Sequence, residues 1–115
     1  MKEGDIVLVL LPQSDGGVKY RPALVLRRTP GFDDLLVCAI STQLRRRVHD
    51  FDDMIESSHG DFKASGLKIT SLIRLGFLAV LPASSFLGKI GSISAKRHHL
   101  LLSKLSEYLR PKDKS

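Results

Sequence analysis

The residue best placed to do chemistry is Arg21, which directly precedes Pro22 and the apolar run 23–26. The stretch 14–17, Ser-Asp-Gly-Gly, lies just upstream. Proline fixes its own φ and biases the residue before it toward extended geometry. We therefore expect the backbone of Arg21 to be held while the glycine loop beside it moves. Such a guanidinium suits a phosphate contact, because its planar fork can bind two phosphate oxygens at once.

Hydroxyl and guanidinium side chains follow a second apolar run, residues 35–40. Ser41 and Thr42 end this run, and hydroxyl residues are common where a strand ends. An arginine triplet, residues 45–47, comes next and would lie at the same rim of the fold as the end of this run. We expect it to contact a nucleic-acid backbone from a mobile loop, with a solvated run of charge as the alternative.

The distribution of charge favours a polyanionic partner. Eighteen Lys and Arg against twelve Asp and Glu give a net charge of +6. The segment 48–61 is rich in acidic residues and has no Lys or Arg, so the rest of the chain is more basic than the total indicates. Such a surplus attracts nucleic acid through counterion release, although many basic proteins bind none.

The sequence has no pattern typical of a metal or cofactor site. Cys38 is the only cysteine, which excludes a disulfide and a cysteine zinc site and suits a reducing cytoplasm. His49 and His59 flank the acidic segment, and we expect both to be solvated. The adjacent His98 and His99 would point in different directions from a helix and would not share a metal ion.

Length and composition indicate one globular domain. The chain has 115 residues, of which 43% are hydrophobic and 26% charged, and it is long enough to bury a core. We expect a single domain over residues 1–110 and a charged tail over 111–115 that frays. The apolar run 6–11 is too short for a signal-peptide core or a membrane span, so we expect a cytoplasmic protein without membrane contact.

Short apolar runs bounded by Gly, Pro and Asp predict β-strands. The expected strands cover residues 6–11, 22–28, 35–41, 70–75 and 77–81. Gly76 separates the last two. Short strands of this kind predict a mainly β (α+β) fold built on a small, SH3-like β-barrel.

The apolar pattern changes to helical spacing near the C-terminus. Ser94 can cap a helix that stops before Pro111. Apolar residues three and four positions apart mark one face of this helix. These residues are Leu101, Leu102, Leu105, Tyr108 and Leu109. We therefore expect one C-terminal helix packed against a curled sheet.

Five segments in a fixed order carry a family resemblance. They read Gly-Asp-Ile-Val at 4–7, Arg-Pro-Ala-Leu-Val at 21–25, Ala-Ile-Ser-Thr-Gln at 39–43, Gly-Leu-Lys-Ile-Thr-Ser-Leu-Ile-Arg at 66–74 and Gly-Lys-Ile-Gly at 88–91. No single segment is specific. Their order and spacing, from about residue 2 to about residue 109, resemble the MazF/PemK family of bacterial toxins.

The resemblance implies a small β-barrel, usually a homodimer, that cleaves single-stranded RNA at short sequences without a metal or other cofactor. An antitoxin protein ordinarily occupies the RNA groove of such an endoribonuclease and holds it inactive. The 2′-hydroxyl of the RNA attacks the adjacent phosphate and leaves a 2′,3′-cyclic phosphate and a 5′-hydroxyl. The protein then supplies positioning, proton transfer and charge stabilisation.

The resemblance also implies catalytic roles for individual residues. Arg21 matches the family's arginine before proline and would hold the phosphate. Ser41 falls on the family's catalytic threonine, with Thr42 as the alternative one step along. Arg74 aligns with an arginine that some members use in catalysis, or it is a structural or RNA-binding cation. Those members carry an aspartate where this chain has Gly76, which leaves the general base open.

The residues expected to bind RNA surround these positions. They are Lys19, Tyr20, Gln43, Arg45, Arg46, Arg47 and Thr70. Tyr20 is the aromatic residue best placed for base stacking. Other members of the family carry a glutamate in the loop before the arginine that Arg21 matches, where it is a candidate base. The nearest acid in this chain is Asp15, which lies one residue away from that position.

Two other functions stay open from the sequence. One is a catalytically weak or inactive relative that still binds RNA. The other is a toxin of the same fold that poisons DNA gyrase. Toxins of that kind end in an apolar C-terminal segment, which the charged tail of this chain lacks.

Overall fold

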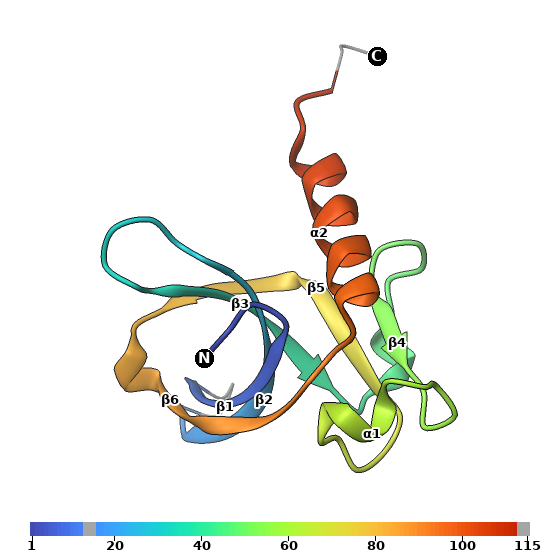
Figure 1. Cartoon of the computed structure of the whole chain (residues 1–115), viewed down its shortest axis with the longest axis horizontal. Helices are drawn as coiled ribbons and strands as arrows, with labels where there is room; N and C mark the ends of the chain where they lie inside the picture. The colour runs from blue at the N-terminus through green and yellow to red at the C-terminus, as the bar shows by residue number, and fades with distance from the viewer. Residues whose placement is uncertain (13–15, 113–115) are drawn as a thin grey trace.

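Within residues 1–12 and 16–112, which the computed structural model describes, six β-strands form one antiparallel sheet that curls into a half-barrel (Figure 1). The strand order is β4-β5-β3-β2-β1-β6. The strands are β1 (Asp5–Pro12), β2 (Val18–Arg28), β3 (Leu35–Ser41), β4 (Asp53–Ile55), β5 (Ser71–Leu81) and β6 (Phe86–Ser92). The mainly β fold predicted from the sequence is confirmed. Residues 14–15 of the expected glycine loop and residues 113–115 of the expected tail lie outside the described residues.

The helices of the described residues are α1 (Phe62–Ser65), α2 (Ala95–Leu109) and the 3-10 helices η1 (Leu44–Arg46) and η2 (Ala83–Ser85). The predicted C-terminal helix is α2. The Ser94 hydroxyl caps it by accepting a hydrogen bond from the backbone N–H of Arg97 at 3.1 Å. The helix packs on the core through Leu101 and Leu105. Its C-terminal end extends beyond the sheet (Figure 1).

The structure corrects the strand predictions at four places. Strand β2 begins at Val18, where the sequence predicted a start at Pro22, so Arg21 lies within the strand. Residues 71–81 form one strand, where the sequence predicted two strands split by Gly76. A bulge interrupts the pairing of β5 with β3 near this glycine. The strands β4 and β6 were not predicted, because β4 is only three residues long within the acidic segment and β6 contains glycines at two positions.

Alternation along the strands separates two apolar clusters on opposite faces of the sheet. Leu24 and Leu26 of β2 are fully buried in the larger cluster, which includes Leu101 and Leu105 of α2. Ala23 and Val25, which alternate with these leucines along β2, belong to the second cluster with valines of β1 and β3. The helix α2 therefore covers one face of β2, and Ala23 lies on the opposite face.

Two glycines allow α1 to contact the edge strand β6. Gly66 ends α1 in the left-handed conformation, with a φ of 73°. A Cβ at Gly66 would overlap the backbone of Ile90, and a Cβ at Gly91 would overlap the carbonyl group of Ser65. The two backbones are therefore in direct contact. This contact joins the segment that follows β4, at one edge of the sheet, to β6 at the other edge.

We expect Gly91→Ala to destabilise the protein by about 2 kcal/mol or more, because the added methyl group must displace backbone atoms. Gly88→Ala in the same strand is the matched control, since nothing lies within 4 Å of the added Cβ. Urea unfolding followed by circular dichroism gives the free energy of unfolding of both variants. Equal values for the two variants would contradict the close contact of α1 with β6.

Candidate active site

The pairing of β2 with β3 places Arg21 and Ser41 on one face of the sheet. Ala23 pairs with Ala39, and Arg21 and Ser41 lie two residues further along the two antiparallel strands. Since side chains alternate along a strand, both residues share the face of Ala23. On its other side Arg21 pairs with Val9 of β1, and Arg21 is exposed.

Arg74 of β5 extends this face to a third strand. It pairs with Ala39, whereas Ser41 pairs with Leu72, so Arg74 lies diagonally from Ser41. The guanidinium carbon of Arg74 lies 5.2 Å from the centre of the Phe77 ring, a cation–π contact that orients this half-buried side chain. Three residues predicted to be catalytic therefore lie on one face of three adjacent strands.

Ser41 ends β3 with its side chain in a turn. Its Oγ accepts a hydrogen bond from the backbone N–H of Gln43 at 3.0 Å, which closes the chain toward η1. This bond uses an oxygen lone pair and leaves the hydroxyl proton for a phosphate oxygen. Thr42 is exposed and lies just past the strand. Of the two hydroxyl residues, Ser41 is therefore the one that lies on the same face of the sheet as Arg21.

Most of the residues predicted to bind RNA flank this face. Residues 45–47 are exposed, the first two within η1 and the third at its C-terminal end. Lys19 and Tyr20 are also exposed and precede Arg21 in β2. Alternation puts Lys19 on the face of Arg21 and Tyr20 on the opposite face.

Thr70 and Gly76 have surroundings that no sequence pattern indicates. Thr70 Oγ1 accepts a hydrogen bond from the backbone N–H of Ser57 at 3.0 Å, which joins the segments after β4 and before β5. A Cβ at Gly76 would lie 3.2 Å from Cε2 of Phe51. The glycine, at the position where the resemblance implies an aspartate in some members, therefore lies in close contact with an aromatic ring. Asp15, the other acid considered, lies outside the described residues.

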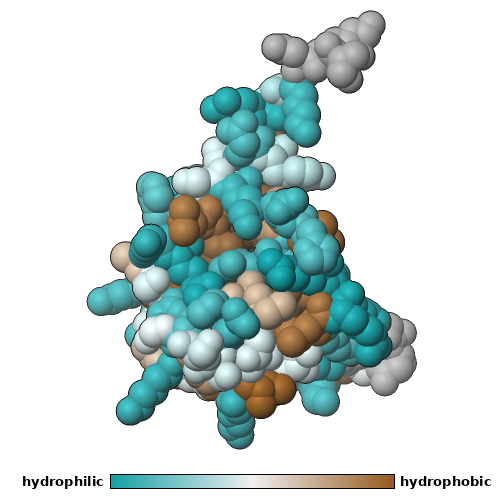
Figure 2. Space-filling model, turned by 90° about the vertical axis from the view of Figure 1, so that its right-hand side faces the viewer, coloured by the Kyte–Doolittle hydropathy of each residue, from teal (hydrophilic) through white to brown (hydrophobic). Residues whose placement is uncertain are grey.

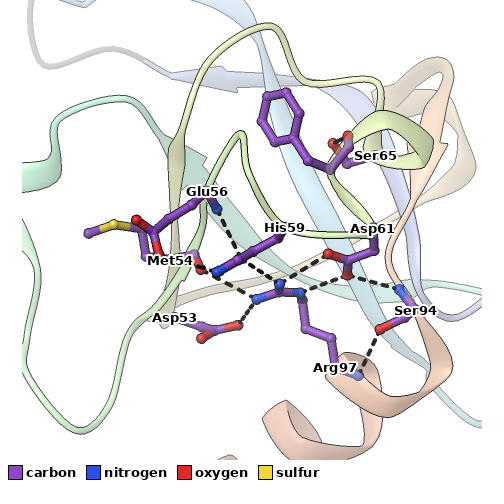
Figure 3. Close-up of polar contacts among 9 residues, drawn as sticks. Asp53, Met54, Glu56, His59, Asp61, Ser65, Ser94 and Arg97 are labelled. Carbon is purple, nitrogen blue, oxygen red and sulfur yellow. Dashed lines mark hydrogen bonds and ion pairs between the residues drawn. The ribbon is translucent and has the colours of Figure 1, made fainter.

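An ion-pair network ties α2 to the sheet (Figure 3). Arg97, in the first turn of α2, donates to Asp53 of β4 at 2.6 Å and to both carboxylate oxygens of Asp61 at 2.8 and 3.1 Å. The three side chains are largely buried. Hydrogen bonds from Arg97 lower the pKa of Asp61 from an ordinary 3.8 to about 2. The network holds α2, β4 and the start of α1 together.

His59 belongs to this network, so this loop histidine is only partly solvated and is also bonded to the protein. Its Nδ1 accepts a hydrogen bond from the backbone N–H of Glu56 at 3.1 Å and lies 3.0 Å from Nη2 of Arg97 (Figure 3). The acidic residues of this segment are visible in the sequence. Their partner is not, because 36 positions separate Asp61 from Arg97.

Figure 2 shows the side of the molecule that carries α2, where apolar patches interrupt a mostly hydrophilic surface. Beside Arg97 a hollow of about 710 Å³ is lined by polar and apolar side chains of α2 and of the segment that follows β4. None of its described lining residues was predicted to be catalytic or to bind RNA. The hollow and the face of Arg21 are therefore separate places.

In residues 1–12 and 16–112, no three His, Cys, Asp or Glu side chains gather closely enough to hold a metal ion. None of the helices described is long and apolar enough to cross a membrane. Cys38 is fully buried, and burial raises the pKa of its thiol to about 12. This cysteine is therefore a neutral side chain of the core at physiological pH.

Comparison with known proteins decides the family. Residues 2–109 match the family described as PemK-like, MazF-like toxin of type II toxin-antitoxin system. The chain belongs to this family. The resemblance seen in the five sequence segments is therefore confirmed. The PemK/MazF-like match extends from before β1 to the end of α2.

The fold of this PemK/MazF-like family member is similar to that of a solved structure. The Mycobacterium tuberculosis toxin MazF-mt6 superposes with a TM-score of 0.67 at 21% sequence identity. The superposition covers 90% of this chain and 93% of that chain. At this identity the likeness shows the fold. Among curated proteins, none matches the sequence.

We expect Asp61→Asn to destabilise the protein by about 2 kcal/mol at neutral pH, since the lowered pKa of Asp61 reflects a favourable interaction of that order with Arg97. The carboxylate stabilises the fold fully above its ordinary pKa of 3.8. This contribution is lost as the pH falls toward about 2. The difference in unfolding free energy between wild type and variant should therefore shrink in acid, as urea unfolding across this pH range measures.

Glu107→Gln is the control for removing one negative charge. Glu107 pairs with Arg110 at 3.7 Å on the surface of α2, where both side chains are exposed. Its removal is expected to change stability little at any pH. A difference between wild type and Asp61→Asn that stays constant from neutral to acid pH would contradict the assigned interaction.

Proposed function

We propose that this protein is the toxin of a type II toxin-antitoxin system and an endoribonuclease that cleaves single-stranded RNA without a metal ion. The face shared by Arg21, Ser41 and Arg74 is the observation that supports this proposal most directly. Two guanidinium groups and a hydroxyl on adjacent strands suit the charge that develops on a phosphate during displacement. Membership in the PemK/MazF-like family supports the toxin function.

The proposed reaction asks little covalent chemistry of the protein, because RNA supplies the nucleophile. The 2′-oxygen forms a bond to the adjacent phosphorus, and the bond from phosphorus to the 5′-oxygen breaks. One proton leaves the 2′-hydroxyl, and one reaches the departing 5′-oxygen. The protein has to hold the phosphate in line for this attack and stabilise the charge that grows on its non-bridging oxygens.

We assign Arg21 to the non-bridging oxygens, because a guanidinium can donate two parallel hydrogen bonds to them. The hydroxyl of Ser41, or of Thr42 beside it, donates a further hydrogen bond. Arg74, oriented by the ring of Phe77, adds a second cation. Arginine keeps its protons at neutral pH, so a different group accepts the proton of the 2′-hydroxyl.

The RNA strand is proposed to cross this face between the arginine segment and the start of β2. Residues 45–47 and Lys19 then contact backbone phosphates, which position the strand. Gln43 can bond to a base edge. The exposed ring of Tyr20 lies on the opposite face of β2, so it could stack on a base only where the strand passes around the start of β2. Thr70 contributes to RNA binding by joining the segment after β4 to the segment before β5.

Membership in the family supports a proposal for the partners and the organisation of this protein. We propose an antitoxin that covers the RNA-binding face and holds the enzyme inactive. A homodimer in the cytoplasm completes the proposal, with one domain over residues 1–110 and a charged tail over 111–115.

A second function, RNA binding with little cleavage, is favoured by one observation. This chain has no carboxylate at Gly76, and the ring of Phe51 packs against the glycine, with its Cε2 3.2 Å from the place of a Cβ. A side chain at this position, such as the aspartate that the resemblance implies for some members, would require the ring to shift by a few tenths of an ångström. The two functions share the same RNA-binding face and differ in the rate of cleavage.

We expect Arg21→Ala to lower the rate of RNA cleavage on the order of 100-fold or more, because it removes a charge contact made in the transition state. The assay uses end-labelled single-stranded RNA of randomised sequence in the presence of EDTA, followed on a gel. Wild type is expected to cleave under these conditions. Circular dichroism checks that the variant is folded.

Arg27→Ala is the matched control, because it removes the same charge from the same strand. Arg27 is exposed and pairs with Glu3 at 3.0 Å, away from the proposed site. It should cleave RNA at nearly the wild-type rate. An equal loss of cleavage rate in both variants would show that Arg21 contributes only its positive charge and makes no specific contact with the phosphate. A requirement for a divalent metal would contradict the mechanism, and RNA that wild type binds but leaves intact would favour the second function.

A further inference from the structure

We propose that Asp52 is a positioning residue that holds the arginine segment 45–47 and Arg74 in a fixed relation. This inference rests on the proposed RNA cleavage for its effect on rate. Its structural part can be tested without RNA.

Asp52 is a buried carboxylate whose two oxygens bind two backbone amides far apart in the sequence. The residue is only 4% exposed. Its Oδ2 accepts a hydrogen bond from the N–H of Val48 at 3.0 Å, and its Oδ1 accepts one from the N–H of Leu75 at 3.1 Å. These charge-assisted bonds offset the cost of burying the charge. Val48 directly follows the arginine segment and Leu75 directly follows Arg74, so one side chain bridges both.

The amide of Leu75 lies in the bulge of β5. Arg74 and Leu78 pair with consecutive residues of β3, so residues 75–77 are extra chain that the ladder does not pair. Backbone amides in such a bulge need acceptors outside the ladder. The carboxylate of Asp52 supplies the acceptor at the start of the bulge.

The bulge determines what surrounds the side chain of Arg74. Phe77 is its last residue, and its ring lies under the guanidinium of Arg74. Phe51 packs against Gly76 in the middle of the bulge, and its ring centre lies 5.0 Å from that of Tyr108 in α2. The turn that carries the buried carboxylate is thus packed between the bulge and the helix. Without the carboxylate, the bulge and the Phe77 ring would shift relative to Arg74.

The bridge matters because one RNA strand would contact both segments. The arginine segment holds the backbone beside the scissile phosphate, and Arg74 acts at that phosphate. A shift of about 1 Å between such groups can cost on the order of 100-fold in rate. Asp52 itself is buried and bound to backbone amides, so it acts through these two segments and does not touch the RNA.

Asp52→Asn tests the bridge, because it keeps the size of the side chain but replaces one oxygen by an NH2 group that cannot accept from a backbone amide. We expect kcat for RNA cleavage to fall on the order of 10-fold to 100-fold, by a larger factor than KM rises. We also expect trypsin to cut after residues 45–47 faster than in wild type, since the segment loses its anchor. Mass spectrometry of the fragments identifies the cut.

Asp50→Asn is the matched control, with the same loss of charge in the same turn. Asp50 is exposed and has a φ of 64°, a conformation that asparagine also tolerates. This variant should match wild type in both kcat and trypsin cleavage. Changes confined to Asp52→Asn would support the bridge. An Asp52→Asn variant that cleaves RNA and resists trypsin as Asp50→Asn does would overturn it.

The experiments distinguish a failure of the proposed RNA cleavage from a failure of the proposed Asp52 bridge. If wild type cleaves no RNA, the proposed function fails, and the trypsin comparison still decides whether the bridge exists. If Asp52→Asn does not fold, hydrogen exchange of wild type decides. The amides of Val48 and Leu75 should both be protected, although Val48 itself is 56% exposed. An unprotected Val48 amide would overturn the proposal.

Discussion

The antiparallel register at Ala39 is the constraint on which the candidate site depends. Ala39 pairs with Ala23 of β2 on one side and with Arg74 of β5 on the other. A shift of one residue in either pairing would move a cation to the opposite face, because side chains alternate along a strand. The arrangement of Arg21, Ser41 and Arg74 is therefore a property of the central strand pairing, and the adjoining turn only adds exposed arginines to its rim.

Contacts outside this face hold the ends of the sheet in place. Strand β4 pairs with β5 just beside Arg74, and Arg97 binds both β4 and the residue before α1. The end of α1 in turn touches β6 through Gly66 and Gly91. Side-chain ion pairs and one close backbone contact thus join the two edge regions of the half-barrel. The strands that carry the site lie between these edges.

Local sequence signals predicted the elements that carry the site, and long-range contacts left no such signal. The apolar run 35–41 predicted β3 at both ends, and Ser94 predicted the start of α2, because consecutive residues encode both features. The contact of Arg97 with Asp61 and the two amides bound by Asp52 depend on residues distant in the chain. Glycine at a strand interior was interpreted as a break, whereas the structure uses it where a bulge meets an aromatic ring.

The most direct test of RNA cleavage by this face is the chemistry of the product ends. A defined single-stranded RNA is cut in the presence of EDTA, and the fragments are analysed by mass spectrometry. Attack by the RNA's own 2′-hydroxyl leaves a 2′,3′-cyclic phosphate on one fragment and a 5′-hydroxyl on the next, which is the expected result. Fragments with 3′-hydroxyl and 5′-phosphate ends would contradict it, because they require attack by water in place of the 2′-hydroxyl.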